Sequence, residues 1–146
     1  MYGPHPQPDE IPLREREDAM GAYLMMFAAV AVALPLPVIN LIAAIVYYFV
    51  NRRKSDFIHF HSLQSLLSQF PTTLLNWGLL YWSLQIWLFG NCTICIEFWA
   101  YIGLVVFANI VYFVFSLIAA IKAYRGEMYY FFGIGSYCYR VVFKRH

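Results

Sequence analysis

The apolar positions of this chain are gathered in three long runs that contain almost no charge. The first extends from Ala19 to Asn51 and the third from Phe98 to Ile121, and neither contains a charged residue. The second extends from Phe57 to Ile96, and only His59 and His61 within it can titrate near neutral pH. Each run exceeds the roughly 20 apolar residues that an α-helix needs to cross a bilayer core. The pattern predicts an all-α integral membrane protein.

Prolines interrupt the first run. A single helix over this run would be about 50 Å long, too long for one straight crossing. Pro35 and Pro37 stand near its middle, where a proline removes a backbone donor and breaks a helix. Two short crossings joined at the prolines would place both termini on the same side of the membrane, and one kinked crossing would not. The sequence is compatible with either three or four membrane crossings, and it slightly favours the short hairpin.

We therefore predict a four-helix polytopic bundle whose first two helices form a short, proline-broken hairpin. A proline-rich start predicts an extended N-terminal tail. The aromatic stretch near the end is too short to span, which predicts an interfacial segment because tyrosine and phenylalanine settle at the headgroup level. The predicted divisions are a tail over 1–19, a membrane domain over 20–125 with helices at 20–34, 38–50, 57–89 and 97–122, and an interfacial aromatic and basic segment over 126–146.

Composition supports a membrane protein, and the distribution of charge predicts its orientation in the membrane. Hydrophobic residues make up 62% of the chain and charged residues 12%, which fits a membrane protein better than a water-soluble one. The formal net charge of +2 is not gathered in one patch, so nucleic-acid binding has no support. Basic residues follow the first and third runs, and the 90–96 loop has none. By the positive-inside rule both termini are cytoplasmic and the 90–96 loop is extracytoplasmic.

A polar stripe runs along one face of the predicted 57–89 helix. At 3.6 residues per turn its members fall within a sector about 120° wide. Polar groups inside a membrane are unfavourable unless they face protein or water. The expected packing partners are Asn109 and Ser116, which lie seven positions apart on the last helix. We favour packing over a water-filled groove. The stripe consists of His61, Gln64, Ser65, Ser68, Thr72 and Asn76.

Evidence for catalysis or a cofactor is weak. His59 and His61 are two positions apart, and residues at that spacing do not face one another on a helix. His61 alone is a weak candidate for a metal or haem ligand, and we expect no metal or cofactor. Cys92 and Cys95 have C-x-x-C spacing in the outer loop, where a disulfide and free thiols are both open. The sequence shows no set of a nucleophile, a general base and a general acid, so we expect the protein not to be an enzyme.

The order of several short motifs resembles a known family. These are RERED before the first run, NRRKSDF after it, FIHFHSLQSLLSQF, and FSLIAAIKAYRGEMY near the end. They resemble small bacterial membrane proteins related to the Tic-twenty-like family, whose plant members belong to the protein-import machinery of the chloroplast inner envelope. The resemblance implies four transmembrane helices with both termini inside, in a bacterial inner membrane. It places the family's helix-start motif at Phe60, His61 and Gln64.

These patterns favour a non-catalytic accessory or scaffolding subunit of a larger membrane complex. Its expected partners are the lipid bilayer and neighbouring protein subunits. One alternative is a component of a protein-translocation or other channel, with the polar stripe lining a path. Another is a cofactor-holding subunit of an electron-transfer complex that uses His61.

Overall fold

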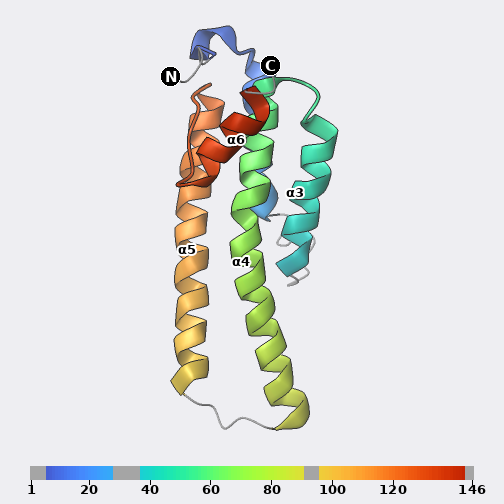
Figure 1. The fold of residues 1–146 in the computed structure, drawn as a ribbon, viewed down its shortest axis with the longest axis vertical. Helices are drawn as coiled ribbons and strands as arrows, with labels where there is room; N and C mark the ends of the chain where they lie inside the picture. Colours follow the sequence, from blue (N-terminus) through green and yellow to red (C-terminus); the bar gives the residue numbers. More distant parts are fainter. Residues whose placement is uncertain (1–5, 28–36, 91–95, 144–146) are drawn as a thin grey trace.

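The structure is a computed structural model, and it describes residues 6–27, 37–90 and 96–143. In these ranges the chain is entirely helical, with no strand, which confirms the predicted all-α class (Figure 1). Two short 3₁₀ turns, η1 (Pro8–Glu10) and η2 (Met25–Phe27), flank the first helix. The described α-helices are α1 (Leu13–Leu24), α3 (Pro37–Asn51), α4 (Asp56–Phe89), α5 (Ile96–Tyr124) and α6 (Ile134–Phe143).

The helices form a bundle that is thick at one end and thin at the other. The long helices α4 and α5 run antiparallel along the full length of the molecule (Figure 1). α1 packs against both of them, while α3 and α6 pack against α4. These three shorter elements gather at the end where both termini lie, and α4 and α5 extend beyond them as a two-helix hairpin (Figure 1).

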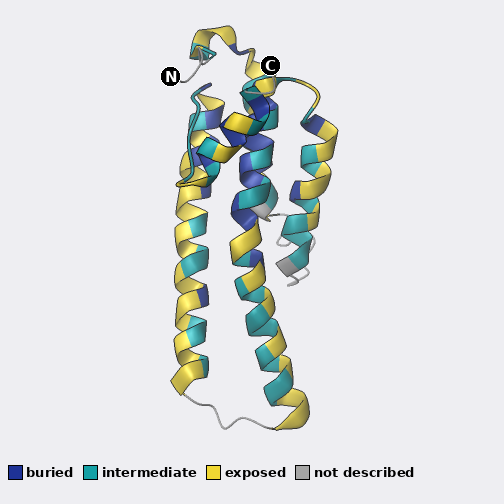
Figure 2. Ribbon diagram, in the orientation of Figure 1, coloured by how far each residue is buried: buried dark blue, intermediate teal, exposed yellow. Residues whose placement is uncertain are grey.

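Burial follows this arrangement. Buried residues concentrate in the half of the bundle near the termini, and the far half of the hairpin is largely exposed (Figure 2). One core cluster joins Ala19 and Tyr23 of α1 to Phe57 of α4 and Ala119 of α5. Small residues on α1 and α5 let these helices approach closely, so the thick end is the packed core.

Helix α4 has well-defined ends. At its start the Ser55 hydroxyl accepts a hydrogen bond from the Ile58 N–H at 3.3 Å, and Asp56 lies in the first turn. Such a cap satisfies an otherwise unpaired backbone donor. At its end Gly90 has φ +59°, a left-handed conformation that favours glycine, and its N–H bonds to Ile86. The sequence placed this helix at 57–89.

The N-terminal region differs from the prediction. A helix begins at Leu13, inside the segment expected to be an extended tail to residue 19, so that expectation is wrong from Leu13 onward. Pro12 is the last proline of the tail and stands at the helix N-cap, where its missing N–H removes no helical bond. The charged residues after it are good helix formers. The predicted 20–34 helix lies partly outside the described residues, because the 28–36 stretch is not described.

Residues before α1 lie against the end of α5. The Arg16 guanidinium donates to the carbonyl oxygens of Ile11 (2.8 Å) and Pro8. A Cβ on Gly126, which follows α5, would lie 3.1 Å from the Pro8 Cα. Gly126 also has φ +77°, which disfavours any other residue. The described part of the tail is therefore packed against the bundle.

By length and composition, α5 is the one described helix that is long and apolar enough to cross a membrane. The apolar stretch Val38–Asn51 of α3 is shorter. Helix α4 is longer than α5 but carries the polar stripe. The structure thus supports one clear candidate span in an all-helical chain, which is less than the predicted four crossings.

The chain after α5 folds back onto the bundle. Helix α6 packs on α4 through a cluster of Phe60, Cys138, Tyr139 and Val142. Cys138 is fully enclosed, and its burial raises the pKa of its thiol to about 12. The thiol therefore stays protonated and unreactive at neutral pH. The Lys122 ammonium in the last turn of α5 lies 2.9 Å from the carboxylate of Glu127, in the connection that follows, and lowers the pKa of Glu127.

Candidate functional site

Gln64 is the centre of a buried hydrogen-bond network at the thick end of the bundle. Its side chain is fully buried on α4. The amide nitrogen donates to the Tyr129 carbonyl oxygen at 2.8 Å, and the amide oxygen accepts from the Phe131 N–H at 3.3 Å. A carbonyl can only accept and a backbone N–H can only donate, so these two contacts fix the orientation of the amide. Gln64 therefore ties α4 to the connection between α5 and α6.

The fixed orientation of the Gln64 amide determines which atoms donate in the next hydrogen bonds of the network. The second N–H of Gln64 donates to the Tyr23 hydroxyl oxygen at 2.9 Å. The hydroxyl lies 2.9 Å from Nδ1 of His61, and its own proton is free to point there. Nδ1 then accepts, which corresponds to a neutral imidazole with its proton on Nε2. We call Tyr23, His61 and Gln64 the central cluster.

Aromatic rings enclose His61. Its ring centroid lies 4.5 Å from that of Phe57 and 5.1 Å from that of Phe60, both in edge-to-face arrangements. Tyr23 meets it in the same arrangement at 5.7 Å. The side chain of His61 has no exposed surface. The central cluster is a packed joint between α1, α4 and the 127–133 segment, with no opening at the imidazole.

The next members of the polar stripe bond locally or to α1. Ser65 donates to the Ala22 carbonyl oxygen of α1 at 2.7 Å. The hydroxyls of Ser68 and Thr72 donate to carbonyl oxygens one turn earlier on their own helix, those of Ser65 and Gln69, both at 2.9 Å. The bonds that Ser68 and Thr72 donate therefore stay within α4.

At the far end of the stripe, Asn76 pairs with Asn109 of α5. Each amide nitrogen donates to the other's amide oxygen at 3.1 Å, so the two side chains form a reciprocal pair. Each also donates to a carbonyl oxygen of its own helix, that of Thr72 or Val105. Ser116, the other expected partner, is buried on α5. None of the hydrogen bonds described joins it to the stripe.

The Asn76–Asn109 pair should show strong energetic coupling. We expect Asn76→Leu and Asn109→Leu each to lower the free energy of unfolding in detergent by about 1 kcal/mol, because each leaves the partner amide unpaired. The double variant should lose clearly less than the sum of the two losses. A double-mutant cycle on thermal or denaturant unfolding measures this. Additive losses would contradict a direct pair.

The geometry gives little room for a metal. The Tyr23 hydroxyl is hydrogen-bonded to Nδ1 of His61, and the imidazole ring is enclosed. Among the described residues there is no group of three His, Cys, Asp or Glu side chains placed to hold a metal ion. Cys92 and Cys95 lie outside the described residues, so a disulfide and free thiols both stay open there.

Sequence reasoning missed two parts of the hydrogen-bond network around Gln64. Tyr23 was not expected as a partner, and neither were the backbone groups of Tyr129 and Phe131. Tyr23 did carry a signal, because a tyrosine inside an apolar run needs a partner for its hydroxyl when buried. The backbone partners carried none, since any residue offers the same groups.

Comparison with known families identifies the chain. The model of the magnetosome magnetite crystal formation protein family (MamF/MmsF) matches residues 15–136, and the chain belongs to this family. Comparisons with curated proteins and with solved structures give no significant match. The resemblance to the Tic-twenty-like family is therefore wrong, and the expected role in protein translocation loses its support. The motifs behind it were short and partly apolar, so unrelated helical membrane proteins can share them.

Proposed function

We propose that this chain is a non-catalytic protein of the magnetosome membrane that supports magnetite crystal formation as an accessory or scaffolding subunit of a larger assembly. The family supplies the setting, a membrane-associated role in crystal formation. The observation that favours this role over a channel is the central cluster. Gln64 and Tyr23 direct their hydrogen bonds to other parts of the same chain, so the stripe holds helices together at this end.

We further propose that the hairpin of α4 and α5 crosses the membrane. α5 is long and apolar enough to cross. Large apolar side chains are exposed along the far half of both helices, where they suit lipid or a neighbouring subunit. In this arrangement both termini are cytoplasmic, and the 90–96 loop is on the opposite side. Exposed examples on the hairpin are Leu74, Trp77, Tyr81, Trp87, Trp99, Leu104, Phe107 and Ile110.

The remaining divisions of the chain follow from this proposal. Residues 20–125 would form the membrane domain, in which α3 adds a short apolar helix beside α4. The residues before it would contribute the start of α1, and the 126–146 segment would lie at the headgroup level. The exposed Phe132 and Tyr137 suit that interface.

Complementation tests the proposed function. In a magnetite-forming bacterium that carries this gene, deletion should change crystal size or number, as measured by electron microscopy, and the wild-type gene should restore both. Gln64→Leu should fail to restore them, because it opens the central cluster, and Gln85→Leu on the same helix should succeed. Normal crystals after deletion would overturn the role in crystal formation.

The assembly is tested separately. Purification of a tagged chain from magnetosome membranes in mild detergent should recover it at a mass above that of one chain. Recovery as a monomer, together with altered crystals in the deletion strain, would overturn the scaffolding role and leave the role in crystal formation.

A further inference from the structure

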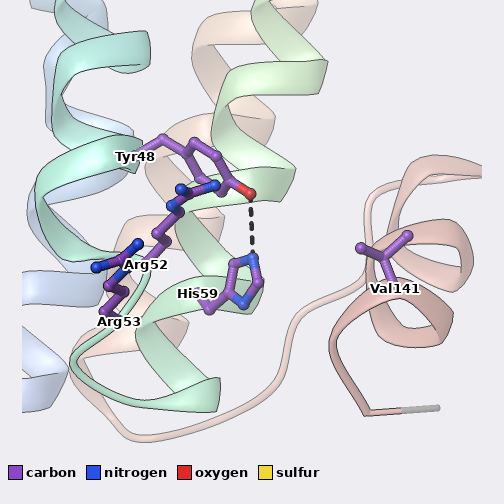
Figure 3. A pocket seen from close by; sticks show the side chains of 5 residues that line it. All are labelled: Tyr48, Arg52, Arg53, His59 and Val141. Carbon is purple, nitrogen blue, oxygen red and sulfur yellow. Dashed lines mark hydrogen bonds between the residues drawn. The ribbon is translucent and has the colours of Figure 1, made fainter. Parts of the chain in front are cut away.

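A basic pocket lies at the thick end of the bundle, apart from the central cluster. It has a volume of about 380 Å³ and lies where α3, α4 and α6 meet. Figure 3 shows Tyr48 from α3, Arg52 and Arg53 from the turn after it, His59 from α4, and Val141 on the facing side from α6. These five residues line the pocket.

The charge of this pocket is not balanced within the described chain. Two guanidinium groups line it, and no carboxylate does among the residues that the structure places there. The neighbouring Lys54 is different, because it forms an ion pair with Asp18 of α1 at 2.8 Å. Neither that pair nor the Lys122–Glu127 pair involves Arg52 or Arg53.

The side chains of the pocket are held in place. The Arg52 guanidinium lies over the Phe49 ring at 4.8 Å and near the Tyr48 ring at 5.8 Å, in cation–π contacts. Such stacking covers the face of the guanidinium and leaves its N–H edge available. The Tyr48 hydroxyl and Nε2 of His59 lie 3.1 Å apart, a hydrogen bond drawn in Figure 3. Arg52, Tyr48 and His59 are therefore oriented before any ligand enters.

An exposed apolar stripe on α3 leads to the pocket. Ile42, Val46, Phe49 and Val50 are each more than half exposed. Three of them recur at spacings of four and three, so they share one face of the helix. Phe49 ends the stripe directly beneath the Arg52 guanidinium. Apolar surface that ends in a basic pocket matches a molecule with hydrocarbon chains and an anionic head.

We propose that this pocket binds the phosphate group of an anionic phospholipid, whose acyl chains lie along the apolar stripe of α3. Guanidinium groups bind phosphate oxygens through paired, charge-assisted hydrogen bonds. Clusters of basic residues on the cytoplasmic side of membrane helices bind lipid head groups by the same chemistry. The phosphate chemistry is shared with free inorganic phosphate, and the apolar stripe favours the lipid.

Lipid titration of the full chain tests the proposal. Native mass spectrometry of the purified protein in detergent, titrated with phosphatidylglycerol or phosphatidylcholine, measures the preference for the anionic head group. The wild type should prefer phosphatidylglycerol. Arg52→Gln with Arg53→Gln should lower that affinity about tenfold or more, because two charge-assisted contacts are lost. Affinity for phosphatidylcholine should hardly change.

A charge-matched control separates the pocket from general attraction. Arg14→Gln with Arg125→Gln removes the same two charges from exposed positions that do not line the pocket. It should change the affinity less than about threefold, because charges outside the pocket reach the bound head group only through screened, long-range attraction. An equal loss in both double variants would overturn the proposal, as would a wild type without preference.

A third variant keeps the charge and fills the space. Val141→Phe enlarges the apolar wall opposite the arginines and should also weaken phosphatidylglycerol binding, which tests the pocket even if the double arginine variant does not fold. Circular dichroism of each variant reports its fold. Excess inorganic phosphate should leave the lipid bound. Binding of inorganic phosphate to a wild type that shows no preference for phosphatidylglycerol would assign the pocket to free phosphate and overturn the lipid proposal.

Discussion

Gln64→Leu is expected to lower the free energy of unfolding by about 3 kcal/mol. The leucine would leave the Tyr129 carbonyl and the Phe131 N–H without their partner. It would also remove the hydrogen bond that the Tyr23 hydroxyl accepts, although that hydroxyl keeps its bond to His61. A buried polar group that loses its partner costs about 1 to 3 kcal/mol. Because leucine is similar in size to glutamine, the effect comes mainly from hydrogen bonding and not from a cavity.

Thermal unfolding in detergent, followed by circular dichroism, measures this loss. Gln85→Leu is the matched control, since it makes the same change further along α4 at a partly exposed position outside the central cluster. Its midpoint temperature of unfolding should stay within a degree or two of the wild-type value, as is usual for surface substitutions. Equal shifts in the two variants would show that loss of polarity in α4, and not the central cluster, is responsible.

Gly135→Ala is expected to release α6 from the bundle. A Cβ at this position would lie 2.7 Å from both Cα and Cβ of Tyr130, too close for real atoms. Because one of the obstructing atoms is backbone, the helix or the connection must move. Overpacking of this kind costs about 1 to 3 kcal/mol. The contacts of α6 with Phe60 should weaken first, since that face holds it on α4.

Alkylation of Cys138 reports this release. The thiol is fully buried and its pKa is raised to about 12, so it should resist a maleimide in the wild type. In Gly135→Ala it should react many times faster, as read by peptide mapping that separates Cys138 from the other cysteines. Gly103→Ala is the control, because its Cβ meets nothing within 4 Å. A Cys138 that stays inert in Gly135→Ala would contradict the predicted release.

The elements that the sequence predicted well depend on local or periodic signals. The absence of charge over long stretches predicted the all-α class. Ser55, Asp56 and Gly90 mark the ends of α4 by capping chemistry that acts within one turn. The facing of Asn76 and Asn109 was expected from helical periodicity, because a fixed number of residues per turn places side chains on known faces.

The parts that the sequence could not predict depend on long-range packing. Tyr23 and His61 are 38 positions apart, and Gln64 and Tyr129 are 65 apart. Their meeting depends on how α1 and the connection after α5 are placed. That connection turns at Gly126 and Gly133, both with φ +77°, and a glycine in a sequence does not reveal which way it turns. The start of α1 at Leu13 was missed because the prolines before it suggested an extended chain.

The family assignment shows the limit of short motifs. The RERED, NRRKSDF and FIHFHSLQ segments describe charged helix ends and a capped, partly polar helix, which many membrane proteins need. The match over residues 15–136 depends on the whole pattern instead. The family places the chain among magnetosome crystal formation proteins, and the scaffolding role is the proposal made above.

The uneven thickness of the bundle has a geometric consequence. Where α1, α3 and α6 surround α4 and α5, the described part of the chain has a wide cross-section, and beyond them only two helices remain (Figure 1). Inserted with its wide end toward the cytoplasm, this wedge occupies more area in the outer leaflet of a vesicle than in the inner one. A closed vesicle has that same imbalance of leaflet area, and the imbalance grows as the radius shrinks. The taper therefore suits a small, strongly curved compartment better than a flat membrane.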